Sequence, residues 1–246
     1  MKKYFKIVAL FLLYFIFFQT TVFPQNFLTT NNYSENILEN GIKVFILEDF
    51  SIPTINVKYT VSAGFSAQNK NNTGFFKLYS KLFKTGYTEE ENLENLNFSE
   101  ECNSDISAYS MTVTPISLEK SLESLAKHAF NSSFTDKNIK AELDLMKNEV
   151  MQYSSTPASF INAGIDSRIF SSEPWKFDSG IYPALFSKTT PSQARTILEE
   201  IAKKFYTPQN SCIFISGCVK KEAALELIEK TFGIYKRSAV SQKAAP

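Results

Sequence analysis

Apolar residues follow two different periods along the chain, and each change of period marks an expected element. Alternation of apolar and polar positions predicts strands over 42–47 and 54–61, the second with its apolar side chains on one face. Pro53 interrupts the segment between them. Because the two strands are close in sequence, we expect them to pair as a hairpin.

Helical spacing replaces alternation at Gly74. Phe75, Leu78 and Leu82 form an apolar stripe over 74–84, and we expect Gly86 to close this helix. The same patterns predict a short acidic helix over 88–97 and strands over 102–106, 109–115 and 211–216. Further helices are expected over 117–130, 136–153, 158–170, 190–205 and 220–232. Ser117 is the expected N-cap of the first of these, Pro157 ends the second, and a Thr190–Gln193 capping box opens the fourth.

Strand pairs followed by helix pairs are typical of an α+β fold, a mostly antiparallel sheet with helices packed on one face. We expect a single domain over 37–235 and a polar, mobile tail over 236–246. The chain has 246 residues, of which 43% are hydrophobic, enough for one ordinary core. With 26 basic and 25 acidic side chains and no long basic block, it is not expected to bind nucleic acid.

Residues 1–25 combine a lysine-bearing start with an unbroken apolar run over 7–18. As a helix that run covers about 18 Å, short of the roughly 30 Å hydrocarbon core of a membrane. The segment therefore predicts a secretory signal peptide, with an uncleaved anchor as the alternative. We expect an exported protein, periplasmic or secreted, that has no membrane association after signal removal.

Cysteine and histidine are scarce in the chain. Cys102, Cys212 and Cys218 are odd in number, and the last two fall on one expected strand about 20 Å apart, so we expect small buried residues or free thiols. The single histidine, His128, excludes histidine-rich metal sites, and we expect a structural or capping role for it. Trp175 is expected to serve packing.

The order of several short motifs resembles a known family. These are Asn40-Gly41-Ile42-Lys43-Val44, a strand ending in Ser62-Ala63-Gly64, a helix opened by Gly74, and Phe205-Tyr206-Thr207-Pro208-Gln209-Asn210 followed by a strand, Gly217, a helix and Phe232-Gly233. Over about 38–235 the chain resembles the N-terminal domain of the M16 family, which includes pitrilysin, insulin-degrading enzyme, mitochondrial processing peptidase and the core subunits of the bc1 complex.

Active members of that family carry H-x-x-E-H on the helix that begins at Gly74. Two histidines four residues apart share a helix face and hold zinc, and the glutamate activates water. The matching positions here are Lys77, Ser80 and Lys81, so both ligands are lysine and the base is serine. The resemblance therefore implies that the zinc site is lost and that no cofactor is bound.

The family's third ligand is a glutamate on a later helix, and the resemblance assigns it to Glu149, with a supporting glutamate at Glu142. Seven residues is close to two helical turns, so both carboxylates share a face. Lys77 and Lys81 are either a solvated helix face or, if the two helices still meet, cations that pair with Glu149 in place of the metal.

The resemblance implies a noncatalytic M16-like domain whose partners are another M16-like subunit or domain and extended peptides. By analogy the peptide would add as a strand at the edge formed by Asn103, Ser104, Asp105 and Ile106. The competing interpretation is a structural or interaction module without any peptidase complex, or a truncated gene product. A weaker alternative is an active enzyme that uses unfamiliar residues.

Overall fold

The computed structural model describes residues 32–91, 97–152, 156–172, 176 and 188–239. The expected signal peptide and Trp175 lie outside the described residues. Among the described residues, no helix has the length and apolarity needed to cross a membrane.

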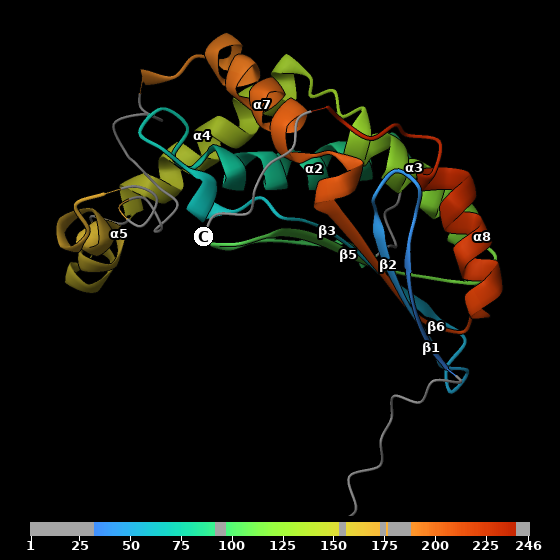
Figure 1. Cartoon of the computed structure of the whole chain (residues 1–246). Helices are drawn as coiled ribbons and strands as arrows, with labels where there is room; N and C mark the ends of the chain where they lie inside the picture. The colour runs from blue at the N-terminus through green and yellow to red at the C-terminus, as the bar shows by residue number, and fades with distance from the viewer. Residues whose placement is uncertain (1–31, 92–96, 153–155, 173–175, 177–187, 240–246) are drawn as a thin grey trace, which may run out of the picture. The chain divides into compact units, whose positions relative to one another are not determined.

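The described residues form one sheet covered by helices on one face (Figure 1). The strands are β1 (Tyr33–Ile37), β2 (Lys43–Glu48), β3 (Ile55–Val61), β4 (Ser99–Cys102), β5 (Ser107–Val113) and β6 (Ser211–Gly217), in the order β1-β2-β6-β3-β5-β4. The β2–β6 pair is parallel and the other pairs are antiparallel. The mostly antiparallel α+β fold expected from the sequence is confirmed.

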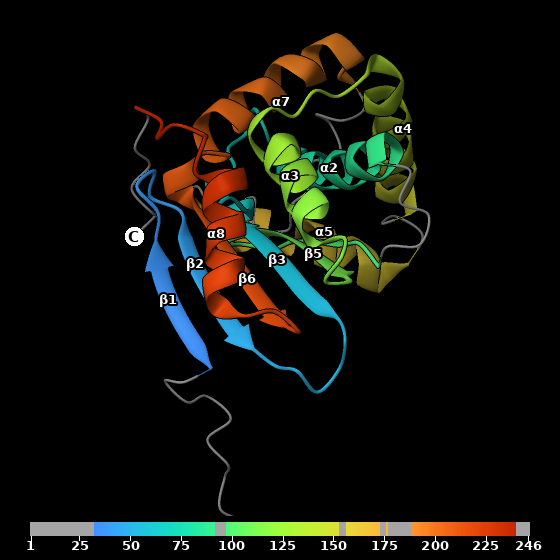
Figure 2. The ribbon, with the colours of Figure 1, turned by 90° about the vertical axis from the view of Figure 1, so that its right-hand side faces the viewer.

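The helices are α2 (Phe75–Glu91), α3 (Leu118–Phe130), α4 (Asp136–Gln152), α5 (Pro157–Ile169), α7 (Pro191–Phe205) and α8 (Lys221–Phe232). In Figures 1 and 2, α2, α3, α7 and α8 lie on the same face of the sheet, and α4 lies beside α2 at the end far from α8. The capping box at Thr190 and Gln193 is present as expected. Ser117 does not cap α3 with its side chain; its hydroxyl instead bonds Thr114.

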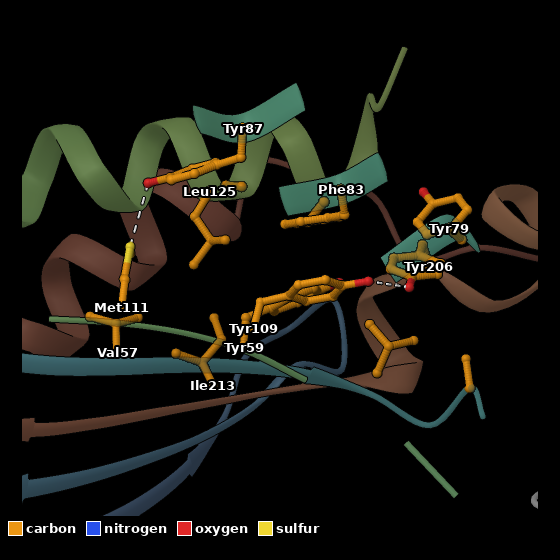
Figure 3. Packing of buried hydrophobic residues seen from close by; sticks show 14 of the residues in the cluster. Val57, Tyr59, Tyr79, Phe83, Tyr87, Tyr109, Met111, Leu125, Tyr206 and Ile213 are labelled. Carbon is orange, nitrogen blue, oxygen red and sulfur yellow. Dashed lines mark hydrogen bonds between the residues drawn. The ribbon is translucent and has the colours of Figure 1, made fainter. Parts of the chain in front are cut away.

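Aromatic side chains fill the layer between the sheet and the helices (Figure 3). Phe83 of α2 stacks on Tyr109 of β5 with ring centroids 3.8 Å apart. The Tyr109 and Tyr206 hydroxyls lie 2.6 Å apart, and the Tyr87 hydroxyl donates to the sulfur of Met111 at 3.4 Å. Burial is therefore accompanied by hydrogen bonds between the polar ends of these rings.

Strand pairing differs from the expected hairpin. β6 lies between β2 and β3, with Phe45 opposite Phe214 and Tyr59 opposite Ile213. β1, in a polar segment for which no strand was predicted, completes the sheet by pairing with β2. The hairpin prediction was wrong because β6, about 150 residues later in the chain, competes successfully for the same two edges.

Two element boundaries were also wrong. α2 continues past Gly86, and a Cβ atom at that position would lie 2.9 Å from Cε1 of His128. Gly86 therefore makes room for the imidazole and does not end the helix. The strand expected over 102–106 is β4, which ends at Cys102 and is followed by a turn. Ser238, in the segment expected to be mobile, forms two hydrogen bonds with Gln209, and residues 240–246 lie outside the described ones.

Candidate functional site

The positions that correspond to the family's metal ligands lie where α2 packs against α4. The apolar stripe of α2 is buried, with Leu78 and Leu82 at 0% exposure, and this orients the helix on the sheet. Lys77 and Lys81, four residues apart, therefore project from a neighbouring face of α2 toward α4. Burial of the apolar stripe therefore determines which face of α2 is turned toward α4.

Glu149 receives both lysines. Lys77 Nζ donates to Glu149 Oε1 at 2.5 Å, and Lys81 Nζ donates to Oε2 at 3.3 Å. The side chains of Lys77, Lys81 and Glu149 are 26%, 29% and 33% exposed, so the group is half-buried and open to solvent. The ion pair that the sequence left open as one of two alternatives is present, and the lysines are not simply a solvated face.

The protonation of Glu149 reflects two opposing effects. Burial alone raises the pKa of the carboxyl, whereas the hydrogen bond and charge of Lys77, together with those of Lys81, lower it. The net result is a pKa below the ordinary value of about 4.5. At neutral pH Glu149 is therefore a carboxylate held between two ammonium groups.

Glu142 does not belong to the lysine cluster. Its Oε1 accepts a hydrogen bond from Thr85 Oγ1 at 2.9 Å, one to two turns beyond the lysines along α2. Lys77, Lys81 and Thr85 follow one another at intervals of four, so the three residues line the interface with α4. The sequence did not single out Thr85, although this spacing was a signal for it.

Ser80 and His128 are both in the interior. Ser80, at the position that the resemblance assigns to the family's base, is 1% exposed, and its hydroxyl oxygen has no hydrogen-bond partner among the described residues. His128 is 4% exposed and packs edge-on against Phe83 with ring centroids 4.7 Å apart. The imidazole sits against Gly86, nine residues or about 13 Å along α2 from Lys77, which confirms its structural role.

The donor set does not fit zinc. Zinc needs unprotonated nitrogen, sulfur or oxygen ligands in a near-tetrahedral arrangement. Here one carboxylate meets two ammonium groups that offer no lone pair. Within the described ranges, no group of three or more His, Cys, Asp or Glu residues is arranged to hold a metal ion.

Strand β4 lies along α2 and forms one end of the sheet. Lys84 Nζ pairs with Glu100 Oε2 at 3.0 Å. Burial raises the pKa of the Cys102 thiol at the end of β4 to about 11, against the opposing effects of the Ser107 hydrogen bond and the charge of Lys77. In the described part of the chain, no strand pairs with the outer edge of β4.

The turn after β4 is occupied by internal hydrogen bonds. The carbonyls of Asn103 and Ser104 accept from the amides of Phe65 and Ser66 at 2.9 and 2.8 Å. The amides of Asp105 and Ile106 both donate to the Asn103 side chain at 3.0 Å. The four residues expected to form a peptide-binding edge are therefore a closed turn, and the open edge is β4 itself, Ser99–Cys102.

Family models match both halves of the chain. Residues 43–176 match the model described as insulinase, peptidase family M16. This chain belongs to peptidase family M16. Residues 194–246 match a second model of the same family, described as the peptidase M16 inactive domain.

The relatives agree with this assignment. The chain is 25% identical over 116 residues to the uncharacterized zinc protease YmfH of Bacillus subtilis, covering 47% of this chain and 26% of YmfH. It has the fold of a protease from Helicobacter pylori (TM-score 0.73, 16% identity, 87% of this chain and 52% of that one). An M16 inactive domain from Pseudomonas fluorescens is equally similar (TM-score 0.74, 15% identity, 87% and 53%). The chain thus spans about half the length of these structures and a quarter of YmfH.

Proposed function

We propose that this chain is a noncatalytic M16 domain that binds extended peptides and works beside another M16-like subunit or domain. One observation carries the proposal: both positions of the histidine ligands hold lysines, and these lysines are bonded to Glu149, the residue in the place of the third ligand. The ammonium groups of the two lysines supply the positive charge that a metal ion would otherwise provide beside Glu149.

The residues at this site also lack an effective base. Peptide hydrolysis needs a group that removes a proton from water, and that group must be within hydrogen-bond reach of it. Ser80 is buried, and Glu149 is held as a carboxylate with a lowered pKa by two lysines. Ser80 is therefore out of reach of a solvent-accessible peptide, and the lowered pKa makes Glu149 a weak base.

Peptide binding needs none of the lost residues. An extended peptide can add to a sheet edge through main-chain hydrogen bonds, which are independent of side-chain chemistry. The outer edge of β4 offers such groups, and α2 lies along the strand. We therefore assign the peptide to Ser99–Cys102 in place of the Asn103–Ile106 turn.

The partner and the location are part of the same proposal. The chain covers only about half of the M16 structures that it matches, which favours assembly with a further M16-like domain. Residues 1–25 support export, and the similar first half of PqqL from Escherichia coli is described as part of a periplasmic protease (TM-score 0.70, 14% identity, covering 87% of this chain and 49% of that one).

An interaction module without a peptidase complex is the second candidate. The sheet face opposite the helices carries a row of stacked rings, Tyr33 with Phe45 at 6.5 Å and Phe45 with Phe214 at 5.0 Å between centroids. Phe214 is 42% exposed, and a hollow of about 840 Å³ lies beside it, lined among others by Lys58 and Ser110. Exposed aromatic rings beside a hollow are typical of surfaces that bind another protein.

Metal analysis and peptide titration test the proposal together. Protein purified without chelator should contain far less than one zinc per chain and should leave an unstructured peptide uncleaved, while calorimetry detects binding of extended peptides. About one zinc per chain with chelator-sensitive cleavage would refute the noncatalytic assignment. Absence of peptide binding, with no M16 chain co-purifying, would favour the interaction module.

Proline substitution tests the location of the peptide. Adjacent amides of a strand point to opposite edges, so one of Glu100→Pro and Glu101→Pro removes an outward amide and the other breaks the ladder to β5. The variant that remains folded should bind extended peptides at least about tenfold more weakly. Glu100→Ala is the control for loss of the Lys84 pair. Unchanged affinity in the folded proline variant would exclude this edge.

A further inference from the structure

The cluster between α2 and α4 carries more positive than negative charge. Lys77 and Lys81 supply two ammonium groups, and Glu149 supplies one carboxylate. Glu142 accepts a hydrogen bond from Thr85 and is not in contact with either lysine. The three side chains in direct contact, Lys77, Lys81 and Glu149, therefore carry a net charge of about +1 at neutral pH.

The adjacent ion pair on α2 leaves the charge of these three groups unchanged. Lys84, the next lysine on this side of α2, is paired with Glu100 of β4 at 3.0 Å, so that pair is neutral. Lys81 lies 3.3 Å from Glu149, a looser contact than the 2.5 Å of Lys77. Lys81, which is 29% exposed, is thus the ammonium group best able to bind an additional anion.

The excess charge lies beside the open edge of the sheet. Along α2, Lys84 pairs with Glu100 of β4, and Lys77 lies about two turns before Lys84 on the same side of the helix. Lys81 comes between them in sequence and on the same side of the helix. A peptide strand added to the outer edge of β4 would pass within reach of its ammonium group.

We propose that Lys81, supported by Lys77, binds a carboxylate carried by an extended peptide that lies along β4. The proposal rests on the peptide-binding function argued above and names the chemistry of the preferred ligand. The carboxylate comes either from the C-terminus of the peptide or from an acidic side chain that faces α2. Either carboxylate would bind Lys81, and peptides that carry only one of the two distinguish between these sources.

Glu149 acts as an internal competitor in this arrangement. Its carboxylate accepts from both lysines, so an incoming carboxylate has to share Lys81 with it. Charge-assisted hydrogen bonds of this kind are stronger than neutral ones, and a half-buried site screens them only in part. Removing the charge of Glu149 should therefore strengthen binding of an acidic peptide.

Calorimetric titration of the whole chain tests the proposal. The probe is an acetylated eight-residue peptide of valine and threonine, used with a free C-terminus and as the C-terminal amide. A second pair, both amides, carries glutamate or glutamine at one central position. The carboxylate member of at least one pair should bind about 3- to 10-fold more tightly than its neutral counterpart, and the pair that responds identifies the source of the carboxylate.

The variants assign the effect to the lysine. Lys81→Ala should reduce the ratio of affinities to about one, Lys81→Arg should preserve it, and Glu149→Gln should increase it. Lys230→Ala, which removes an exposed lysine on α8 paired with Glu119, should leave it unchanged. If Lys81→Ala does not unfold cooperatively, Lys81→Gln keeps most of the side chain and tests the same point.

The outcomes are distinct for the two proposals. Equal affinity for the acidic and neutral members of both pairs would overturn the carboxylate preference and leave peptide binding intact. A preference that persists in both Lys81→Ala and Lys81→Gln would also overturn it. Failure of every peptide to bind would overturn the carboxylate site and the peptide-binding function together.

Discussion

Glu149 joins α2 and α4 through two ion pairs, and a double-mutant cycle measures how much each contributes to stability. Coulomb's law in a water-like dielectric gives about 1.7 kcal/mol at the 2.5 Å of Lys77 and about 1.3 kcal/mol at the 3.3 Å of Lys81. Ordering a lysine side chain and solvent screening reduce both values. We expect a coupling of about 1 to 1.5 kcal/mol for Lys77 and about 0.5 to 1 kcal/mol for Lys81.

The assay is equilibrium unfolding in urea, because guanidinium is a salt and screens ion pairs. The chains needed are wild type, Lys77→Ala, Lys81→Ala, Glu149→Ala and the two doubles with Glu149. Glu149→Ala alone should cost about 1.5 to 2.5 kcal/mol, because it also leaves two ammonium groups side by side. The double variants separate the pair energy from this side effect.

An exposed pair on the same helix provides the control. Lys140 and Asp144 of α4 are 2.6 Å apart, with side chains 70% and 48% exposed. Their cycle should give a smaller coupling than either lysine pair of Glu149 despite the short distance, since solvent screens them. Couplings below about 0.5 kcal/mol for both Lys77 and Lys81 would refute a structural role for the ion pairs.

The pH dependence of the coupling has a definite sign. The pKa of Glu149 is lowered in the folded chain, so the folded state favours the carboxylate. The stabilisation is fully present above the unfolded value of about 4.5 and is lost as pH falls through the lowered folded value. Couplings measured from pH 7 down to pH 3 should therefore decline only in the acidic part of that range.

Three further predictions follow from the packing and from the ligand positions. Gly86→Ala should destabilise the fold by about 1 to 3 kcal/mol in thermal unfolding, because its methyl would lie 2.9 Å from the ring of His128, and His128→Ala should relieve part of that loss. Gly164→Ala should instead stabilise α5 by about 0.5 to 1 kcal/mol, since nothing lies within 4 Å of the added methyl; a loss of stability in denaturant unfolding would contradict this. The double variant Lys77→His and Lys81→His should bind zinc in calorimetry, because two imidazoles would then face Glu149 of α4. If the double variant does not bind zinc, α2 and α4 are too far apart for coordination.

Local signals in the sequence predicted the helices well. The capping box at Thr190 is present because its hydrogen bonds lie within four residues. Burial of Leu118, Leu122 and Leu125 follows from helical spacing alone. Elements whose stability depends on short-range bonds and on an apolar stripe can be read from the residues themselves.

Contacts between distant segments could not be predicted in this way. The place of β6 between β2 and β3 depends on competition between strands for the same edges, and alternation does not identify a partner. The role of Gly86 depends on an imidazole that arrives from α3. The closed turn at Asn103 depends on the amides of Phe65 and Ser66, which no local pattern connects to it.

The sequence by itself determined that no H-x-x-E-H motif occurs in this chain, because that motif needs two histidines and the chain has one; the resemblance assigns its positions to Lys77, Ser80 and Lys81. Only the tertiary structure decided that both lysines meet Glu149, 72 and 68 residues further along the chain, while Glu142 bonds Thr85. The reason is geometric: which side chains meet across two helices depends on how burial of their apolar faces rotates each helix, and that rotation is a property of the packed core.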